Sequence, residues 1–131
     1  MQITRNGGFA SFPSEHGKWL YYAKGREVPG LWRTPVDGGD EALVMNELQT
    51  GYWGYWTPGP HGIYFLQPAA EKGCALRLAP RSGSGLQTLA KLPDCPPFGD
   101  SGLSVSRDGP DVLFTQVDHS QSEIFLVDPF R

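Results

Sequence analysis

Long apolar runs are absent from this sequence, and their absence argues against the segments that carry a chain into or across a membrane. Residues 1–8 contain no apolar stretch of the length that a signal peptide or a membrane span requires. We therefore expect a soluble chain with no membrane partner. The sequence leaves its compartment open.

Clusters of positive charge are absent as well. The chain has 11 Lys and Arg residues against 14 Asp and Glu residues, a formal net charge of −3. Phosphate backbones are bound by clustered positive charge, whereas these basic residues are spread along the sequence. We therefore expect no nucleic-acid partner. The scattered basic residues include Lys18, Lys24, Arg26, Arg33 and Arg81.

Cysteine is scarce, with only Cys74 and Cys95 in 131 residues. Two thiols do not make the disulfide framework of a small secreted domain, and a chain of this length can bury a core without one. Cys74 lies beside an expected strand and Cys95 in a proline-rich connector, and nothing in the repeat described below requires them to pair. We expect both thiols to be free.

Segments with apolar residues at helical spacing over three turns are also missing, so we expect no helix beyond a stray turn. The sequence is instead rich in 17 Gly, 12 Pro and 12% aromatic residues. Glycine and proline favour turns, and aromatic residues favour strands. This composition predicts an all-β protein of one domain.

Three segments of the chain share one order of features: a short apolar strand, a turn that ends in glycine, and a second apolar strand. They recur at periods of about 43 to 49 residues, in the range of propeller blades. Glycine closes such turns because it accepts the positive φ that they need. The segments run over residues 9–23, 52–66 and 102–115.

Further strands follow in the same order. A third apolar run occurs at 31–36, 75–79 and 123–127, and a tight turn then leads to a fourth run at 41–44 and 86–89. Four antiparallel strands per repeat make a β-propeller blade. We therefore expect a single partial β-propeller over residues 1–131 with three four-stranded antiparallel blades, at about 7–46, 47–93 and 94–131.

The third blade lacks a fourth strand, and the N-terminus supplies a candidate. Gln2, Ile3 and Thr4 precede the first blade, where the fourth strand of a preceding blade would end. In a second copy they would pair with the strand that contains Ile124 and Leu126. Propellers close with about four to eight blades, so three are too few. We expect a homodimer that closes one six-bladed ring.

The first segment resembles a known family. The glycine-closed turn, the aromatic strand and the run Leu31-Trp32-Arg33-Thr34-Pro35-Val36-Asp37-Gly38-Gly39 resemble the WD40-like (TolB-like) β-propeller repeats of bacteria. The resemblance spans nearly the whole chain, although Ser14-Glu15-His16-Gly17 stands where the family has Ser-Pro-Asp-Gly. We expect a non-catalytic binding or interaction module, because the sequence contains no hydrolase domain and no convergent set of acid, base and nucleophile. The alternative is a fragment of a larger propeller protein, such as the sensor part of a regulator or kinase, or the gating propeller of a peptidase.

The aromatic run at 52–56 is the strongest candidate for a binding site. As the first strand of the middle blade, it would be buried on both faces, which makes packing the first interpretation. The alternative is that its start lines the mouth of the central channel, where a protein or a small molecule would bind. The channel-mouth candidates are Tyr52, Trp53, Asp100 and His119.

Other polar side chains favour structural interpretations. His16 and His61 precede turn glycines of neighbouring blades, which splay apart, whereas metal ligands must lie about 2 Å from one ion. His119 belongs to a polar stretch at 118–122 that a turn explains better than a catalytic triad. Gly83-Ser84-Gly85 is a hairpin turn and not a nucleophile motif. We expect no catalytic residue, no metal and no cofactor.

Overall fold

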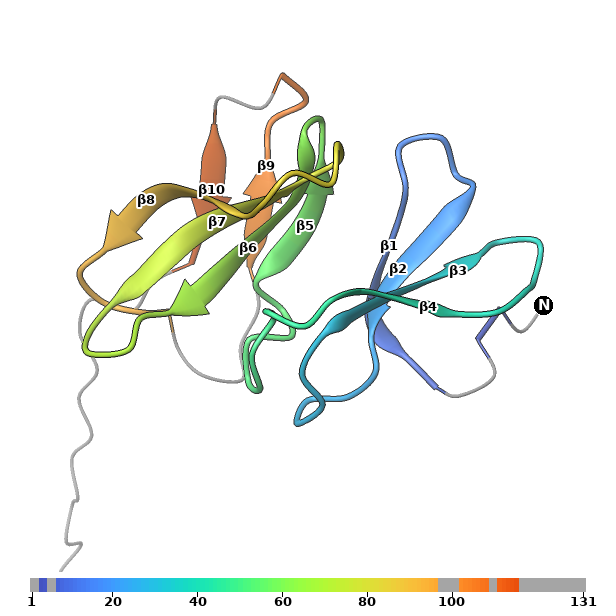
Figure 1. Ribbon diagram of the computed structural model, residues 1–131, viewed down its shortest axis with the longest axis horizontal. Coiled ribbons are helices and arrows are strands. Elements are labelled where there is room, and N and C mark those ends of the chain that lie inside the picture. Colours follow the sequence, from blue (N-terminus) through green and yellow to red (C-terminus); the bar gives the residue numbers. More distant parts are fainter. Residues whose placement is uncertain (1–2, 5–6, 97–101, 109–110, 116–131) are drawn as a thin grey trace, which may run out of the picture.

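The computed structural model describes residues 3–4, 7–96, 102–108 and 111–115. These residues contain strands β1 to β10 and no helix, which confirms the all-β prediction. The strands form three antiparallel sheets, two of four strands and one of two (Figure 1). In the four-stranded sheets the strand order follows the sequence, so each is a simple meander.

The first sheet contains the four strands predicted for the first repeat, to within two residues at each end. They are β1 (Phe9–Pro13), β2 (Trp19–Ala23), β3 (Leu31–Pro35) and β4 (Ala42–Met45). β1 contains a bulge, because Phe9 pairs with Ala23 but Phe12 pairs with Tyr21. Ala10 lies in this bulge with a φ of 49°, a conformation that residues other than glycine rarely adopt.

The second sheet corrects one prediction. Its strands are β5 (Trp56–Gly59), β6 (Gly62–Pro68), β7 (Cys74–Pro80) and β8 (Gln87–Leu92). The strand predicted at 52–56 begins only at Trp56, and it continues through residues that were assigned to a turn. Tyr52 to Tyr55 instead form a turn, in which the Tyr55 N–H donates to the Tyr52 carbonyl over 3.0 Å. The Trp56 indole N–H donates to the Trp53 carbonyl over 2.8 Å and closes the same turn.

The turn between β5 and β6 consists of only Pro60 and His61, and it depends on the glycine that follows. Gly62 has a φ of 146°, and a Cβ at this position would lie 2.1 Å from the carbonyl oxygen of Ala79 in β7. No side chain tolerates such a distance. Glycine therefore allows β7 to pair with β6 up to the edge of the turn.

The third sheet contains β9 (Leu103–Val105) and β10 (Val112–Phe114), as the sequence predicted. The described part of its turn repeats two hydrogen bonds of the turn in the first sheet. The Trp19 N–H donates to Ser14 Oγ and the Asp111 N–H donates to Ser106 Oγ, each over 3.1 Å. In both turns the serine N–H donates back to the carbonyl of that residue over 2.8 Å. The sequence repeat is thus also a repeat of local structure.

The predicted dimer joint is described only in part. Ile3 and Thr4 lie outside any strand in the single chain. Gln2, Ile124 and Leu126 lie outside the described residues, as does the third strand expected at 123–127. The pairing of these segments between two copies therefore stays a prediction.

The three sheets share one hydrophobic core. Leu31, Met45 and Leu48 come from the first sheet and the connector that follows it, and they pack with Phe65 of β6 and with Leu103 of β9. Burying a leucine or phenylalanine side chain stabilises a fold by about 1.5–3 kcal/mol. Because this core crosses the sheet boundaries, the sheets fold together and not as separate modules.

The first strands of the three sheets are neighbours. The Phe12 ring of β1 lies 5.1 Å from the Trp56 ring of β5 in an edge-to-face arrangement. On the other side of β5, a Cβ at Gly59 would lie 2.7 Å from Val105 Cγ1 of β9, so these strands approach closely. The turns that follow β1, β5 and β9 point to the same end of the molecule (Figure 1).

The prediction of free thiols is wrong, because Cys74 and Cys95 form a disulfide with a Cα–Cα distance of 5.0 Å. Cys74 begins β7, and its side chain is buried. β7 and β8 form an antiparallel hairpin, so the end of β8 lies beside the start of β7, where Cys74 pairs with Leu92. The connector after β8 therefore carries Cys95 to Cys74. The pairing follows from the β7–β8 hairpin and not from the repeat.

Candidate functional site

The channel-mouth candidates that can be placed are mainly packing residues. Tyr52 is 6% exposed, and burial raises the pKa of its phenol. Trp53 is half-buried, with its ring centroid 4.8 Å from that of Phe9. The Arg26 guanidinium lies over the Trp53 ring, 5.5 Å from its centroid. Tyr52 therefore packs in the hydrophobic core, from a turn and not from the strand that the packing interpretation assumed. Asp100 and His119 lie outside the described residues.

The connectors at this end of the sheets are fixed by backbone hydrogen bonds. The Gly30 N–H donates to the Leu48 carbonyl over 2.8 Å, and the Gly51 N–H donates to the Arg26 carbonyl over 3.1 Å. The disulfide adds a covalent link at the same end. The hydrogen bonds and the disulfide therefore hold the connectors in place at this end of the sheets.

A charged cluster lies on the side of the first sheet that faces away from the second sheet. Lys24 pairs with Glu41 and lies over the Trp32 ring, 3.7 Å from its centroid. The Tyr22 hydroxyl donates to Glu41 Oε2 over 2.5 Å. Burial, and then this hydrogen bond to a carboxylate, raise the pKa of Tyr22 well above its usual range. Since Tyr22, Lys24 and Glu41 bind one another, we interpret the cluster as structural.

A large cleft lies between the facing surfaces of the two four-stranded sheets. It is at the end of the sheets opposite to the connectors and the disulfide. Its volume is about 1040 Å³. Small-molecule sites typically measure about 300–1000 Å³. The buried side chains of Met45 and Ile63 lie at its base, where the two sheets meet. We call it the intersheet cleft. Its lining includes the half-buried side chains of Trp19, Tyr21, Arg33, Val44 and Glu47.

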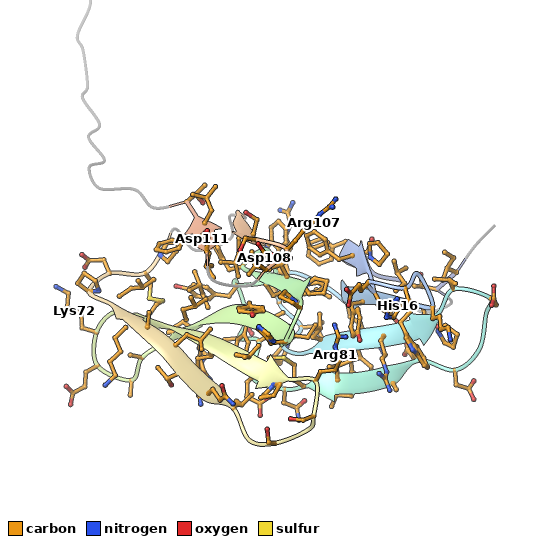
Figure 2. The ribbon with its side chains drawn as sticks, turned by 90° about the horizontal axis from the view of Figure 1, so that it is seen from above. His16, Lys72, Arg81, Arg107, Asp108 and Asp111 are labelled. Carbon is orange, nitrogen blue, oxygen red and sulfur yellow. A yellow bond between two sulfur atoms is a disulfide. The ribbon has the colours of Figure 1, made fainter. Side chains whose placement is uncertain are left out.

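The rim of the intersheet cleft is polar and comes from turns of all three sheets. It includes His16 after β1, Arg81 after β7 and Arg107 after β9, all of which are exposed. Figure 2 shows these three side chains near the boundary between the sheets, whereas Lys72 lies at the far end of the second sheet. Arg81 pairs with Glu15 over 3.2 Å, and this contact joins the two sheets across the rim.

The intersheet cleft was not predicted from the sequence. Its lining residues are far apart in the chain, and only the folding of two successive sheets brings them to one surface. His16 was singled out in the sequence as a turn residue, and the structure places it in an exposed turn at the rim of the cleft. His61 is exposed in the turn between β5 and β6. The cleft's one sequence signal is Arg33, the charged residue of β3, two residues beyond the buried Leu31.

Within the part of the chain that the structure describes, no group of three His, Cys, Asp or Glu side chains is arranged to hold a metal ion. The same residues include no helix long and apolar enough to cross a membrane. Fold and site together define an all-β protein of three antiparallel sheets with a broad cleft between two of them. No protein-family model, curated protein or solved structure shows a significant match to this chain.

Proposed function

We propose that this chain is a non-catalytic binding module of the β-propeller type, whose arc of three blades is completed by a second copy. The observation that carries the proposal is the row formed by β1, β5 and β9. Their sheets follow one another along the chain, and the turns after these three strands point to one end of the molecule. The matching hydrogen bonds of the Ser14 and Ser106 turns support a common repeat.

Both ends of this row present uncovered apolar side chains. In the third sheet, Leu113 of β10 is 74% exposed, on the opposite face from Val112 and Phe114, which pack against the core. In the first sheet, Trp32 pairs with Leu43, which is 43% exposed on the face that points away from the second sheet. A neighbouring blade would cover these side chains, as it does in closed propellers.

The second copy is the simplest neighbour, because two arcs of three blades make a ring of six. Two-fold symmetry would place the first sheet of each copy against the third sheet of the other. Residues Gln2, Ile3 and Thr4 of one copy would then extend the sheet that contains Ile124 and Leu126 of the other. A binding role suits the broad cleft and its aromatic and cationic side chains better than a catalytic role does.

Light scattering on the purified chain tests the assembly. We expect twice the mass of one chain at micromolar concentration, and a loss of the dimer in Leu113→Asp and after deletion of residues 1–5. Leu89→Asp is the matched control, because Leu89 is 45% exposed on the outer strand β8 and takes no part in the proposed contact. A stable, monomeric wild-type chain would contradict the proposal, as would a Leu89→Asp variant that dissociates as readily as Leu113→Asp.

A further inference from the structure

The intersheet cleft concentrates positive charge in a chain whose net charge is −3. Four cationic side chains line it, against the two carboxylates of Glu15 and Glu47. The cations come from the β1–β2 turn, from β3, from the β7–β8 turn and from the turn after β9. They are Lys18, Arg33, Arg81 and Arg107.

Three of these cations have no ion-pair partner among the residues that the structure describes: Lys18, Arg33 and Arg107. The Arg33 guanidinium lies over the Trp19 ring of the cleft wall, with its central carbon 4.3 Å from the ring centroid. A guanidinium held over a ring by a cation–π contact can still donate its N–H groups to a carboxylate. The cleft therefore contains a positioned donor for an anion.

The fourth cation, Arg81, forms only a weak ion pair. The Arg81 and Glu15 side chains are 57% and 60% exposed, and an ion pair in so much solvent contributes little to stability. A carboxylate of a ligand at the rim could replace Glu15 at low cost. Arg81 is thereby a second point of attachment, on the opposite sheet from Arg33.

The shape of the cleft selects among anions. A volume of about 1040 Å³ greatly exceeds that of a single inorganic ion, and the cations are distributed over several elements. Between them lie the aromatic rings of Trp19 and Tyr21 and the side chain of Val44. We propose that the intersheet cleft binds an acidic peptide segment, with its carboxylates on the arginines and its apolar atoms on these rings.

A nucleic acid fits the same cleft less well. A phosphate backbone presents negative charge at every nucleotide, and it would meet the carboxylates of Glu15 and Glu47 as well as the net charge of the chain. A peptide can place uncharged residues opposite these two glutamates. The mixed lining thus favours a peptide in which acidic and apolar residues alternate.

Fluorescence anisotropy with a labelled peptide tests this inference on the full chain. The probe is a capped peptide of alternating Asp, Glu and Leu residues, and the comparison peptide replaces Asp and Glu by Asn and Gln. We expect the acidic peptide to bind at low ionic strength and to weaken as salt is raised above about 0.1 M, because part of the rim is exposed. The uncharged peptide should bind at least about tenfold more weakly.

Three variants locate the site. Arg33→Gln and Arg107→Gln should each weaken binding by about tenfold, since each removes charge-assisted hydrogen bonds. Arg26→Gln is the matched control, because Arg26 also lies over a tryptophan ring but outside the cleft. This variant should bind the acidic peptide as tightly as the wild type does. Arg107 is exposed in a turn, so its substitution tests the cleft even if Arg33→Gln disturbs the stacking on Trp19.

Several results would overturn the inference. These are equal affinity for the acidic and uncharged peptides, an equal loss in Arg26→Gln, tighter binding of a single-stranded oligonucleotide, or no binding of the acidic peptide at millimolar concentration. Light scattering on the same samples separates this inference from the proposed assembly. The cleft lies within one chain, so a monomer that binds the peptide supports the cleft and contradicts only the ring.

Discussion

Removal of the disulfide between Cys74 and Cys95 should cost the fold about 3 kcal/mol. The bridge closes a loop with a sequence separation of 21 residues. The chain-entropy relation for a loop of this length gives about 11 cal/mol/K, or about 3.3 kcal/mol at 25 °C. Cys74 is buried and Cys95 is half-buried against the core, so Cys74→Ala adds a packing loss at least as large as that of Cys95→Ala. For a domain with a typical stability of 5–15 kcal/mol, this loss is large but leaves the chain folded.

Urea unfolding of the oxidised protein, with and without a reducing agent, measures this contribution. We expect the reductant to lower the unfolding midpoint of the wild type and to leave the midpoint of the Cys74→Ala, Cys95→Ala double variant unchanged. Thiol titration of the denatured, unreduced wild type should find no free thiol. Two titratable thiols, or an unfolding midpoint that does not change with the reductant, would refute the claim that a disulfide-closed loop stabilises the fold.

Three further predictions concern the backbone and the tyrosines. Ala10→Gly should stabilise the fold by up to about 1 kcal/mol in thermal unfolding, because glycine adopts the φ of 49° without strain. Gly62→Ala should destabilise it by more than about 3 kcal/mol or prevent folding, because its Cβ would overlap the Ala79 carbonyl oxygen. Burial raises the pKa of Tyr22 and Tyr52 above 10.0, so the stability that they contribute is present below pH 10 and lost as the pH rises further. The free energy of unfolding should then fall by up to about 1.4 kcal/mol per pH unit for each of them, with a shallower slope in Tyr22→Phe.

Matched substitutions serve as controls for the two backbone predictions. Ala42→Gly should destabilise the fold slightly, because Ala42 lies in β4 with an ordinary strand conformation. Gly85→Ala should have little effect, since nothing lies within 4 Å of a Cβ at this position. If Ala10→Gly and Ala42→Gly shift the melting temperature in the same direction, the bulge at β1 is not strained. If Gly85→Ala is as harmful as Gly62→Ala, the clash is not the cause.

The strands of the first sheet could be predicted because each apolar run is bounded by turn residues that act locally. The run at 52–56 misled the prediction because five residues with four aromatic rings fit a strand pattern, whereas the local hydrogen bonds of Tyr55 and Trp56 form a turn. Side-chain capping of this kind has no periodicity. β5 extends to Gly59 because this residue pairs with Gly62 across a two-residue turn, which is tighter than the turn that was predicted over residues 57–62.

The disulfide and the intersheet cleft could not be predicted for a related reason. Both depend on where connectors end after whole sheets have formed, and the repeat describes the strands but not the connectors. Cys95 meets Cys74 because β8 returns alongside β7. Arg33 and Arg107 line one cleft although they belong to different sheets. A sequence repeat indicates equivalent positions, and it gives no measure of the space between units.

The unequal spacing of β1, β5 and β9 has a consequence for stoichiometry. On one side of β5, β1 makes contact through the rings of Phe12 and Trp56, and the intersheet cleft lies between the two four-stranded sheets. On the other side, Gly59 lets β9 approach β5 directly. Each chain therefore has one wide and one narrow gap between its sheets. Titration to saturation should accordingly reach one ligand per chain, whatever number of chains joins the assembly.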